Sequence, residues 1–279
     1  MRSPAVVRSN IELARTWLLT AASDSAAITA ASTCGADAVV LDLEDGVPLR
    51  DKPAARALTS RWLGDGNTGW VRINDATTTD WARDLEMLAD INRVEGVMLA
   101  KAESADQVAA TAEHIPAGTP VVALIESAIG LEEARSIARV DATVRLAFGS
   151  GDFRRDTGTA VDPVSMAYAR SRLVVASRAE RIAPPIDGPT LVESEAALRA
   201  GTAVGAAAGM TGKLVLRPDH VGTINAALSP TEHDIEWAEK VIGELGPDGA
   251  HVTRGSDRPK LARALQIRHL VAVFRLDNS

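Results

Sequence analysis

The sequence is poor in several residue types, and each shortage excludes a class of protein. Its 279 residues include a single cysteine, Cys34, so it can form neither a disulfide framework nor a cysteine-based zinc site. Aromatic residues make up only 3% of the chain, which argues against a stacking surface for single-stranded nucleic acid. The 37 acidic residues outnumber the 30 basic ones, so no basic face neutralises phosphates and we expect no nucleic-acid partner.

Long hydrophobic runs are also absent from the sequence. No uncharged stretch approaches the ~20 residues that cross a bilayer, and the polar first residues lack the apolar core of a signal peptide. We therefore expect a soluble, cytoplasmic protein with no membrane partner. The 46% of hydrophobic residues and the scattered charges are typical of a folded chain rather than a disordered one.

Short apolar runs recur along the chain and alternate with helical patterns. Most runs are rich in leucine or β-branched residues and are bounded by Gly, Pro, Asp or Asn, as in buried parallel strands. We predict one helix over residues 104–114, where Ser104 and Gln107 form a capping box, and another over residues 127–138. The eight predicted strands cover residues 17–21, 38–44, 69–74, 96–101, 120–126, 144–149, 183–187 and 212–217.

This alternation predicts an α/β fold, a (β/α)8 TIM barrel that covers residues 1–229. A doubly wound open sheet is the alternative, but no Gly-x-Gly-x-x-Gly motif follows the first predicted strand. Residues 230–279 carry two further helical patterns, 231–245 and 257–274, and form an additional helical extension. Because a polar linker rich in glycine joins these two helices, we expect the extension to act as a lid or a swapped segment.

Polar residues gather where the predicted strands end, which is the end of a barrel that carries function. The side-chain period of two in a strand places Asp42 and Glu44 on one face, and Arg72 and Asn74 likewise. One of these sets must therefore point inward over the barrel mouth. The other charged residues at or just after strand ends are Asp45, Lys101, Glu126 and Asp152.

These side chains suit metal and carboxylate chemistry. Clustered acids repel one another unless a cation lies among them, and Glu126 and Asp152 offer the oxygen ligands that Mg²⁺ prefers. Arg72 offers a planar fork for a substrate carboxylate or a developing oxyanion. Lys101 allows two interpretations: the nucleophile of a Schiff-base aldolase, or an ion-pair partner inside an acidic mouth.

Several segments together resemble a known family. Residues 35–47 (GADAVVLDLEDGV) resemble the strand-two signature of the citrate lyase β-subunit group within the HpcH/HpaI aldolase superfamily. Further motifs match in the same order and spacing at residues 71–74, 99–104, 123–127, 147–153, 169–172, 186–189 and 212–218. The resemblance runs from about residue 17 to about residue 265.

The resemblance implies a (β/α)8 barrel whose cofactor is Mg²⁺, held by Glu126 and Asp152. It implies that Arg72 and Glu126 bind the substrate, with Arg72 on the substrate carboxylate. It also implies that Glu44 and Asp45 orient a metal-bound water or the reacting hydroxyl group.

A residue near the C-terminus is implicated in the same way. In relatives that act on acyl-CoA, an aspartate on a C-terminal segment completes the site of a neighbouring subunit. Asp257 matches that motif, which implies a homo-oligomer, commonly a trimer. Because Asp257 lies just before Pro259, it also suits the first turn of a helix, and a role as a helix cap is the alternative.

Two positions depart from the family pattern. The loop after the first strand, Thr20–Ser25, lacks the arginine-containing sequence that approaches the phosphates of CoA in the family. Near the eighth strand, Arg217 stands where the family has a histidine. The expected partner is therefore a small oxo-acid, because the metal and carboxylate residues are intact. A CoA thioester is a candidate second partner, although the altered loop argues against it.

These inferences lead to one function hypothesis and two alternatives. We expect a Mg²⁺-dependent carbon–carbon lyase of the retro-aldol or Claisen type, acting on an oxo-acid and acyl-CoA pair such as citryl-CoA or malyl-CoA. The altered loop motivates a metal-dependent aldolase for free oxo-acids without CoA. A catalytically silent barrel that serves as a binding partner is the alternative from a different class.

Overall fold

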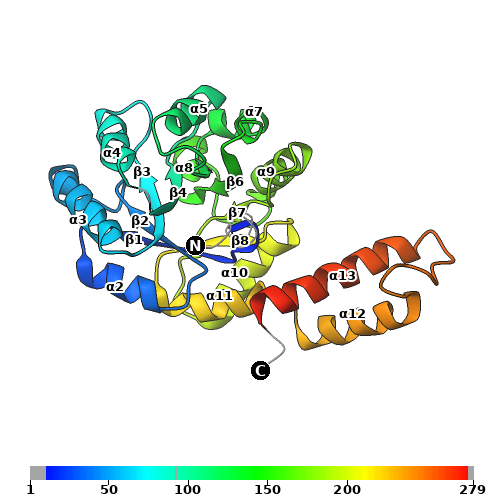
Figure 1. Cartoon of the computed structure of the whole chain (residues 1–279). Helices are drawn as coiled ribbons and strands as arrows, with labels where there is room; N and C mark the ends of the chain where they lie inside the picture. Colours follow the sequence, from blue (N-terminus) through cyan, green and yellow to red (C-terminus); the bar gives the residue numbers. More distant parts are fainter. Residues whose placement is uncertain (1–10, 92, 276–279) are drawn as a thin grey trace. The chain divides into compact units, whose positions relative to one another are not determined.

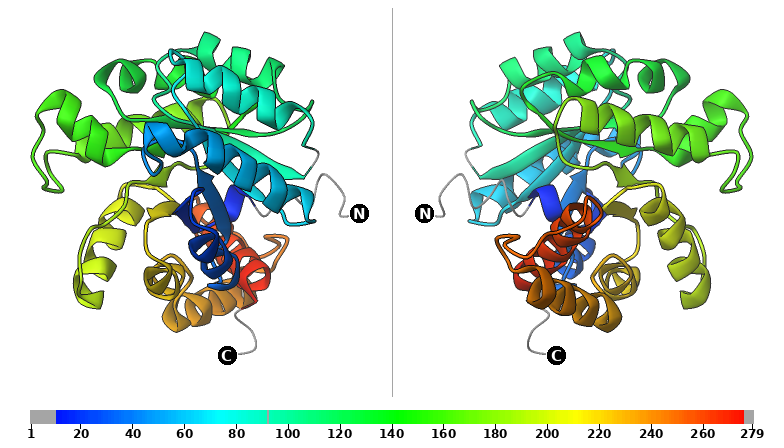
Figure 2. Two further views of the ribbon diagram at one scale, coloured as in Figure 1. Left: turned by 90° about the vertical axis from the view of Figure 1, so that its left-hand side faces the viewer. Right: turned by 90° about the vertical axis from the view of Figure 1, so that its right-hand side faces the viewer.

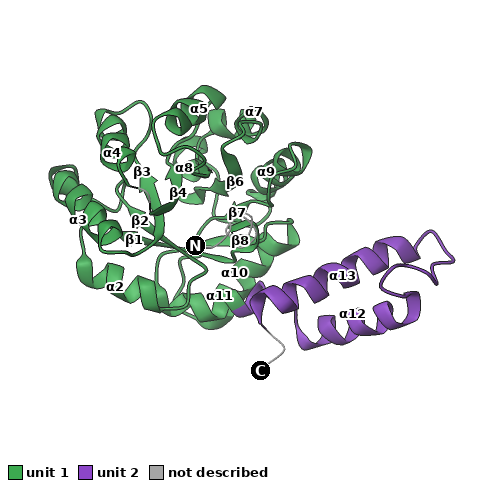
Figure 3. Ribbon diagram, in the orientation of Figure 1, with its two compact units in different colours: residues 1–225 green, residues 226–279 purple. Residues whose placement is uncertain are grey.

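The computed structural model describes residues 11–91 and 93–275. The chain forms two compact units, residues 1–225 and residues 226–279 (Figure 3). Every strand of the described chain belongs to the first unit, whereas the second is helical. Among the described residues, none of the helices combines the length and the hydropathy that a membrane crossing requires.

The first unit contains a closed barrel of parallel strands (Figure 1). Each strand pairs with the next along the chain, and β8 pairs with β1, so the sheet closes. This closure confirms the predicted (β/α)8 barrel and excludes the doubly wound open sheet. The strands are β1 (Thr16–Ala21), β2 (Ala38–Asp42), β3 (Gly69–Ile73), β4 (Val94–Leu99), β5 (Val121–Ile125), β6 (Thr143–Phe148), β7 (Ile186–Asp187) and β8 (Gly212–Val215).

Helices follow the strands and lie around the outside of the barrel (Figure 1 and Figure 2). The predicted capping box is confirmed, because Ser104 accepts the N–H of Gln107 and the Gln107 side chain accepts the N–H of Ser104. The helices are α2 (Ser25–Thr33), α3 (Lys52–Gly64), α4 (Thr79–Ala89), α5 (Ala105–Glu113), α6 (Ala128–Glu132), α7 (Ala134–Ala138), α8 (Ser150–Thr157), α9 (Ala167–Ala179), α10 (Glu195–Ala207) and α11 (Val221–Ala227), with 3₁₀ turns η1 (Leu49–Asp51) and η2 (Pro218–His220).

The prediction of one helix over residues 127–138 is wrong. The backbone leaves the helical conformation at Glu133, where φ is −82° and ψ is 0°, and the segment becomes the two short helices α6 and α7.

Successive residues of each strand face alternately inward and outward. Val40, Trp70 and Leu124 are buried in the interior cluster of the barrel. Their neighbours Leu41 and Val71 belong to a different cluster, which lies between the strands and the helices. This division fixes the direction of the side chains that follow in each strand.

Three charged residues lie at the barrel mouth. Asp42 and Arg72 each lie two positions beyond an interior residue of their own strand, so their side chains point inward. Glu126 lies one residue past β5, and its contact with the Lys101 N–H and its charge interaction with Arg72 place it at the same mouth. The prediction that Asn74 shares this face with Arg72 is wrong. Strand β3 ends one residue before Asn74, and the Asn74 amide donates instead to Asp84 of α4, in the outer layer.

The second unit is a helical hairpin (Figure 3). It consists of α12 (Glu232–Leu245), which opens with a capping box between Thr231 and Asp234, and α13 (Asp257–Phe274). Apolar side chains of both helices, among them Val241 and Ala264, pack into a core of the hairpin's own. Whether this unit acts as a lid or a swapped segment stays a prediction.

Candidate active site

A bidentate ion pair joins two adjacent strands at the mouth. Asp42 of β2 and Arg72 of β3 are register partners. Arg72 Nε donates to Asp42 Oδ1 at 2.7 Å, and Arg72 Nη2 donates to Asp42 Oδ2 at 2.6 Å. Burial disfavours the charged guanidinium, but the carboxylates of Asp42, Glu44 and Glu126 outweigh burial and raise the pKa of Arg72. The Nη1 hydrogens and one Nη2 hydrogen of Arg72 are left for other partners.

Glu44 lies between two cationic side chains. Its Oε1 accepts from Lys101 Nζ at 2.6 Å, and its Oε2 lies 3.2 Å from Arg72 Nη1. The carboxylate is buried, and within the described chain Oε2 accepts no hydrogen bond of normal geometry. Glu44 therefore has a buried acceptor oxygen that a substrate hydroxyl or a water can satisfy.

Lys101 follows β4 and meets several carboxylates. Besides its bond to Glu44, Nζ lies 3.9 Å from Asp45 Oδ1 and 4.0 Å from Asp152 Oδ2. The backbone N–H of Lys101 donates to Glu126 Oε1 at 2.9 Å. Burial acts to lower the pKa of Lys101, but the hydrogen bond and charge of Glu44 outweigh it and raise the pKa. This favours an ion-pair role over a Schiff base, because Schiff-base formation needs the neutral amine.

Glu126 is a buried carboxylate with other carboxylates nearby. Burial raises the pKa of Glu126 to about 8, against the effect of the hydrogen bond from the Lys101 N–H. The negative charges of Glu44 and Asp152 raise it further, while Arg72 acts in the opposite direction. Without a bound cation, Glu126 therefore keeps its proton at neutral pH. A cation that binds the ionised carboxylate would displace this proton.

The space beside Glu126 is kept open by a glycine. A Cβ atom on Gly149 would lie 2.4 Å from Glu126 Oε2, a distance that no side chain tolerates. Gly149 is also the residue before α8, whose first turn carries Asp152. The described residues contain no group of three or more His, Cys, Asp or Glu side chains arranged to hold a metal. Glu126 and Asp152, whose charges interact, are the two carboxylates that this side of the mouth offers. A hard divalent cation bound by them would take its remaining ligands from water and substrate.

A buried polar network lies behind the mouth and supports Glu44 from outside the barrel. Lys52 of α3 donates from Nζ to the carbonyl oxygens of Leu43 and Glu44, at 2.6 and 2.8 Å. It also donates to Asn74 Oδ1 at 2.7 Å. Asn74 in turn donates to Asp84, which is paired with an arginine of α3. The helices α3 and α4 thus fix the backbone that carries Glu44.

The structure brings most of the predicted site residues together. Glu44, Arg72, Glu126 and Asp152 lie at one barrel mouth, linked through Lys101 and by the charge interactions given above. Asp45 lies at the rim, where 60% of its side chain is exposed.

Asp257 belongs to the second unit and has backbone partners there. Its Oδ2 accepts the N–H of Arg254 at 2.8 Å and that of Thr253 at 3.2 Å, and these bonds lower its pKa. Ser256 occupies the N-cap position of α13. The capping alternative is therefore wrong in its simple form, because the carboxylate closes the turn that precedes the helix.

Comparison with known protein families identifies the family of this chain. The family model described as HpcH/HpaI aldolase/citrate lyase matches residues 15–218, and the model of the HpcH/HpaI aldolase C-terminal domain matches residues 233–275. The chain belongs to the HpcH/HpaI aldolase/citrate lyase family. The resemblance seen in the sequence motifs is thereby confirmed.

Relatives within this family carry different activities in their names. A citrate lyase subunit beta-like protein from Mycobacterium tuberculosis is 34% identical over 248 residues, which cover 84% of this chain and 88% of the relative. A (3S)-malyl-CoA thioesterase from Cereibacter sphaeroides is 30% identical over 236 residues, 82% of this chain and 81% of the relative. The solved structure of the protein CitE from Mycobacterium tuberculosis contains magnesium, acetoacetate and coenzyme A. It has 29% identity and a TM-score of 0.78, covering 94% of this chain and 99% of that one.

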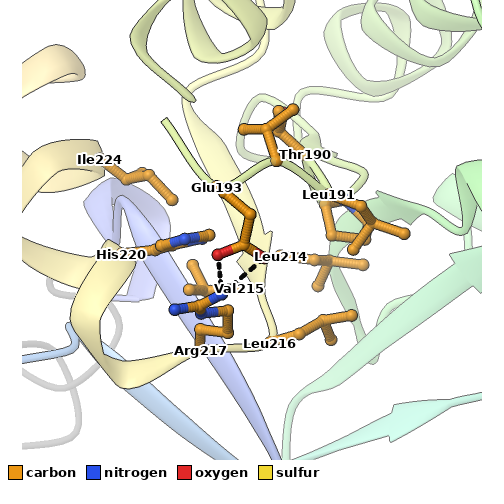
Figure 4. Close-up of a pocket in the computed structure, with 11 residues that line it drawn as sticks. Thr190, Leu191, Glu193, Leu214, Val215, Leu216, Arg217, His220 and Ile224 are labelled. Carbon is orange, nitrogen blue, oxygen red and sulfur yellow. Dashed lines mark hydrogen bonds and ion pairs between the residues drawn. The ribbon is translucent and has the colours of Figure 1, made fainter. Parts of the chain in front are cut away.

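The two departures from the family pattern follow β1 and β8, which are neighbours in the barrel. After β1, Asp24 accepts two backbone N–H groups at the start of α2. After β8, Arg217 lines a cavity of about 200 Å³, where it donates to Glu193 (Figure 4). Arg217 also donates to Asp219. The N–H groups at the start of α2 and the guanidinium of Arg217 would each attract a phosphate. Both are paired with carboxylates of the chain itself.

The sequence pattern alone assigns no role to Asp42, Lys52 or Gly149. Asp42 carried a usable signal, because the ends of adjacent parallel strands meet and Arg72 ends the next strand. Lys52 and Gly149 carry no comparable signal. Their importance rests on contacts with segments distant in the sequence, which a single sequence does not specify.

Proposed function

We propose that this protein is a Mg²⁺-dependent carbon–carbon lyase of the retro-aldol or Claisen type. Its substrate joins an oxo-acid unit to an acyl-CoA unit, as in citryl-CoA or malyl-CoA. The observation that carries the proposal is the buried carboxylate of Glu126 at the mouth, beside Arg72 and near the charge of Asp152. The magnesium, acetoacetate and coenzyme A in the related CitE structure support it.

Glu126 and Asp152 would hold Mg²⁺, in the space that Gly149 leaves open. When bound, Mg²⁺ supplies Lewis-acid stabilisation of the negative charge that develops on the oxo-acid oxygens. Glu126 would thereby take part in substrate binding as well as in metal binding.

The other mouth residues act directly on the substrate. Arg72 binds the substrate carboxylate with the hydrogens that Asp42 does not use, and Asp42 keeps the guanidinium in position before substrate arrives. Glu44 and Asp45 orient the reacting hydroxyl group or a water, Glu44 through its buried Oε2. In the cleavage direction the hydroxyl group loses its proton, the carbon–carbon bond breaks and the acyl α-carbon gains a proton.

The proton at the acyl α-carbon is assigned to Asp257. We place it in the site of a neighbouring copy, within a homo-oligomer that we propose to be a trimer, with residues 230–279 as the lid or swapped segment. The proposed cellular location is the cytoplasm, in keeping with the single cysteine.

A second candidate is an aldolase for free oxo-acids without CoA. It is favoured by the pairing of Arg217 with Glu193 and Asp219, and by Asp24 at the start of α2. Neither position then offers an unpaired positive group to the phosphates of CoA. Titration calorimetry with free CoA and with oxaloacetate separates the two candidates, because only the lyase on thioesters requires CoA to bind.

The test of the metal site uses Glu126→Ala and Asp152→Ala, with Glu86→Ala on the exposed face of α4 as the control. Both site variants should lose Mg²⁺ binding and turnover of citryl-CoA or malyl-CoA, whereas the control keeps both. Loss of one such contact typically costs roughly 10²–10³-fold in rate. Full activity of the wild-type protein in EDTA would contradict a metal-dependent reaction.

A further inference from the structure

Lys101 has an unusual backbone conformation for its residue type. Its φ of 49° lies in the left-handed region, where residues other than glycine are strained. Among the described residues, the other non-glycine residues with positive φ are Arg181 and Arg275, which lie at or just after helix ends. Lys101 instead follows a strand at the barrel mouth. Such strain persists only where the surrounding structure fixes it.

The contacts of Lys101 explain what fixes this conformation. The backbone N–H donates to Glu126 Oε1 at 2.9 Å, while Nζ donates to Glu44 Oε1 at 2.6 Å. Nζ also lies 4.0 Å from Asp152 Oδ2 and 3.9 Å from Asp45 Oδ1. Lys101 therefore lies close to four carboxylates. Its backbone N–H binds Glu126, and its ammonium group faces the other three.

The position of this ammonium group creates a conflict with a divalent cation. Asp152 and Glu126 are the residues assigned above to Mg²⁺. The ammonium group lies 4.0 Å from Asp152 Oδ2 and interacts with the charge of Glu126. Only 29% of the Lys101 side chain is exposed, so solvent screens its charge incompletely. Two cations that share one set of carboxylates repel each other, and each lowers the affinity of the site for the other.

We propose that Lys101 is a positioning residue and the built-in counter-cation of the carboxylate cluster. It holds Glu44 and Glu126 in place for the reaction, and its ammonium group weakens Mg²⁺ binding. The inference rests on the proposed function in that it takes Glu126 and Asp152 as the metal ligands. It separates two effects of one residue: positioning favours turnover, and repulsion limits metal affinity.

The test measures Mg²⁺ affinity by titration calorimetry and turnover by steady-state kinetics for Lys101→Met, which removes the charge and keeps the length of the side chain. Lys101→Arg keeps the charge, and Lys240→Met on exposed α12 is the matched control. Lys101→Met should bind Mg²⁺ about tenfold more tightly. Its kcat should fall about tenfold or more while KM changes little, because Glu44 loses a partner that orients it. Lys101→Arg, which keeps the positive charge, should show no gain in Mg²⁺ affinity. Lys240→Met should match the wild-type protein in both Mg²⁺ affinity and turnover.

Two further variants separate the ammonium group from the backbone. Lys101→Gly and Lys101→Ala both lack the ammonium group, but only glycine adopts a φ of 49° without strain. If both variants bind Mg²⁺ more tightly than the wild-type protein, the missing ammonium group is the cause. The same two variants serve as substitutes if Lys101→Met does not fold.

The outcomes of this test are distinct from those of the proposed function. The role of Lys101 would be overturned if every variant that lacks the ammonium group binds Mg²⁺ no more tightly than the wild-type protein. Mg²⁺ binding that is undetectable in all proteins counts as this outcome. A wild-type protein without turnover of any thioester or oxo-acid sinks the proposed reaction. A clear gain in Mg²⁺ affinity on removal of the ammonium group would still support Lys101 as the counter-cation in that case.

Discussion

At the residue scale, Glu126 is the mouth carboxylate whose ionised form is most disfavoured by burial and by neighbouring negative charges. Its carboxylate is buried, and burial raises its pKa to about 8 in the metal-free protein. The neighbouring charges of Glu44 and Asp152 act in the same direction. A carboxylate in this position is costly as an isolated anion, and a bound cation relieves that cost.

The raised pKa of Glu126 predicts how Mg²⁺ binding depends on pH. Mg²⁺ binds the ionised carboxylate, so below the pKa each binding event must release the proton of Glu126. Affinity should therefore rise by up to about tenfold per pH unit from about pH 6 and level off above about pH 8. Calorimetry in two buffers of different ionisation enthalpy measures the proton release. A flat affinity with no proton release over this range would contradict the assignment.

Gly149 offers a second prediction at the residue scale. In Gly149→Ala the new methyl group would lie 2.4 Å from Glu126 Oε2, so the carboxylate must move. We expect Mg²⁺ affinity to fall at least about tenfold, since metal ligands must be held within a few tenths of an ångström. Gly151→Ala, two residues later and with nothing within 4 Å of the new Cβ, is the control and should bind Mg²⁺ normally. Equal affinity of the two variants would show that Glu126 is not confined by Gly149.

At the scale of the elements, α3 stabilises the loop after β2 through one buried lysine. Lys52→Met removes three hydrogen bonds and leaves the carbonyl oxygens of Leu43 and Glu44 without this donor. We expect the free energy of unfolding to fall by about 3 kcal/mol, because three hydrogen bonds from a buried ammonium group are lost and Asn74 Oδ1 loses its donor. The carbonyl oxygens of Leu43 and Glu44 keep the N–H groups of the Asn74 side chain and of Val47. Turnover should fall as well, since Glu44 is no longer fixed. Urea unfolding of the metal-free protein measures the first effect.

The control for this prediction lies two residues away. The Arg50 side chain is 86% exposed and its ion pair with Asp51 spans 3.5 Å. Arg50→Ala should change the unfolding free energy by less than about 0.5 kcal/mol. If Lys52→Met were as stable and as active as this control, the loop would not depend on α3.

Most strands could be predicted from the sequence because they are short apolar runs between polar turns, whereas β7 is only the two residues Ile186–Asp187. The segment β5, with five buried residues in succession, can be satisfied only by a strand covered on both faces. The charged strand-end residues Glu126 and Arg72 could be placed at one mouth, because parallel strands end at the same edge. The break at Glu133 could not be foreseen, since the apolar pattern of residues 127–138 continues through it.

The interactions that hold the site together could not be read from the sequence. The bond between Lys52 and Asn74 joins residues 22 positions apart, and nothing in either residue type specifies it. The left-handed conformation of Lys101 runs against the preference of lysine, so local propensity predicts the opposite. Both features are consequences of the closed barrel and not of the segments in which they occur.

At the scale of the whole molecule, Asp257 is predicted to act in the site of a neighbouring copy. Asp257→Asn and Glu126→Ala should each be inactive as pure proteins. After the two are unfolded and refolded together, mixed oligomers contain some sites with an intact Glu126 from one copy and an intact Asp257 from another. Activity of the mixture should therefore recover.

A mixture of Glu126→Ala with Asp152→Ala provides the matched control for complementation. Both residues belong to the first unit, so no combination of these copies restores a complete mouth. Recovery in this control, or an active Asp257→Asn protein on its own, would limit Asp257 to the turn that it closes with Thr253 and Arg254.

The central claim is that this chain breaks a carbon–carbon bond with the help of Mg²⁺. The products formed from malyl-CoA test it most directly, by mass spectrometry of the quenched reaction in Mg²⁺ and in EDTA. Carbon–carbon cleavage yields glyoxylate and acetyl-CoA, whereas thioester hydrolysis yields malate and free CoA. We predict glyoxylate and acetyl-CoA in equal amounts, with Mg²⁺ only. Malate and free CoA as the sole products, or the same turnover in EDTA, would contradict the account.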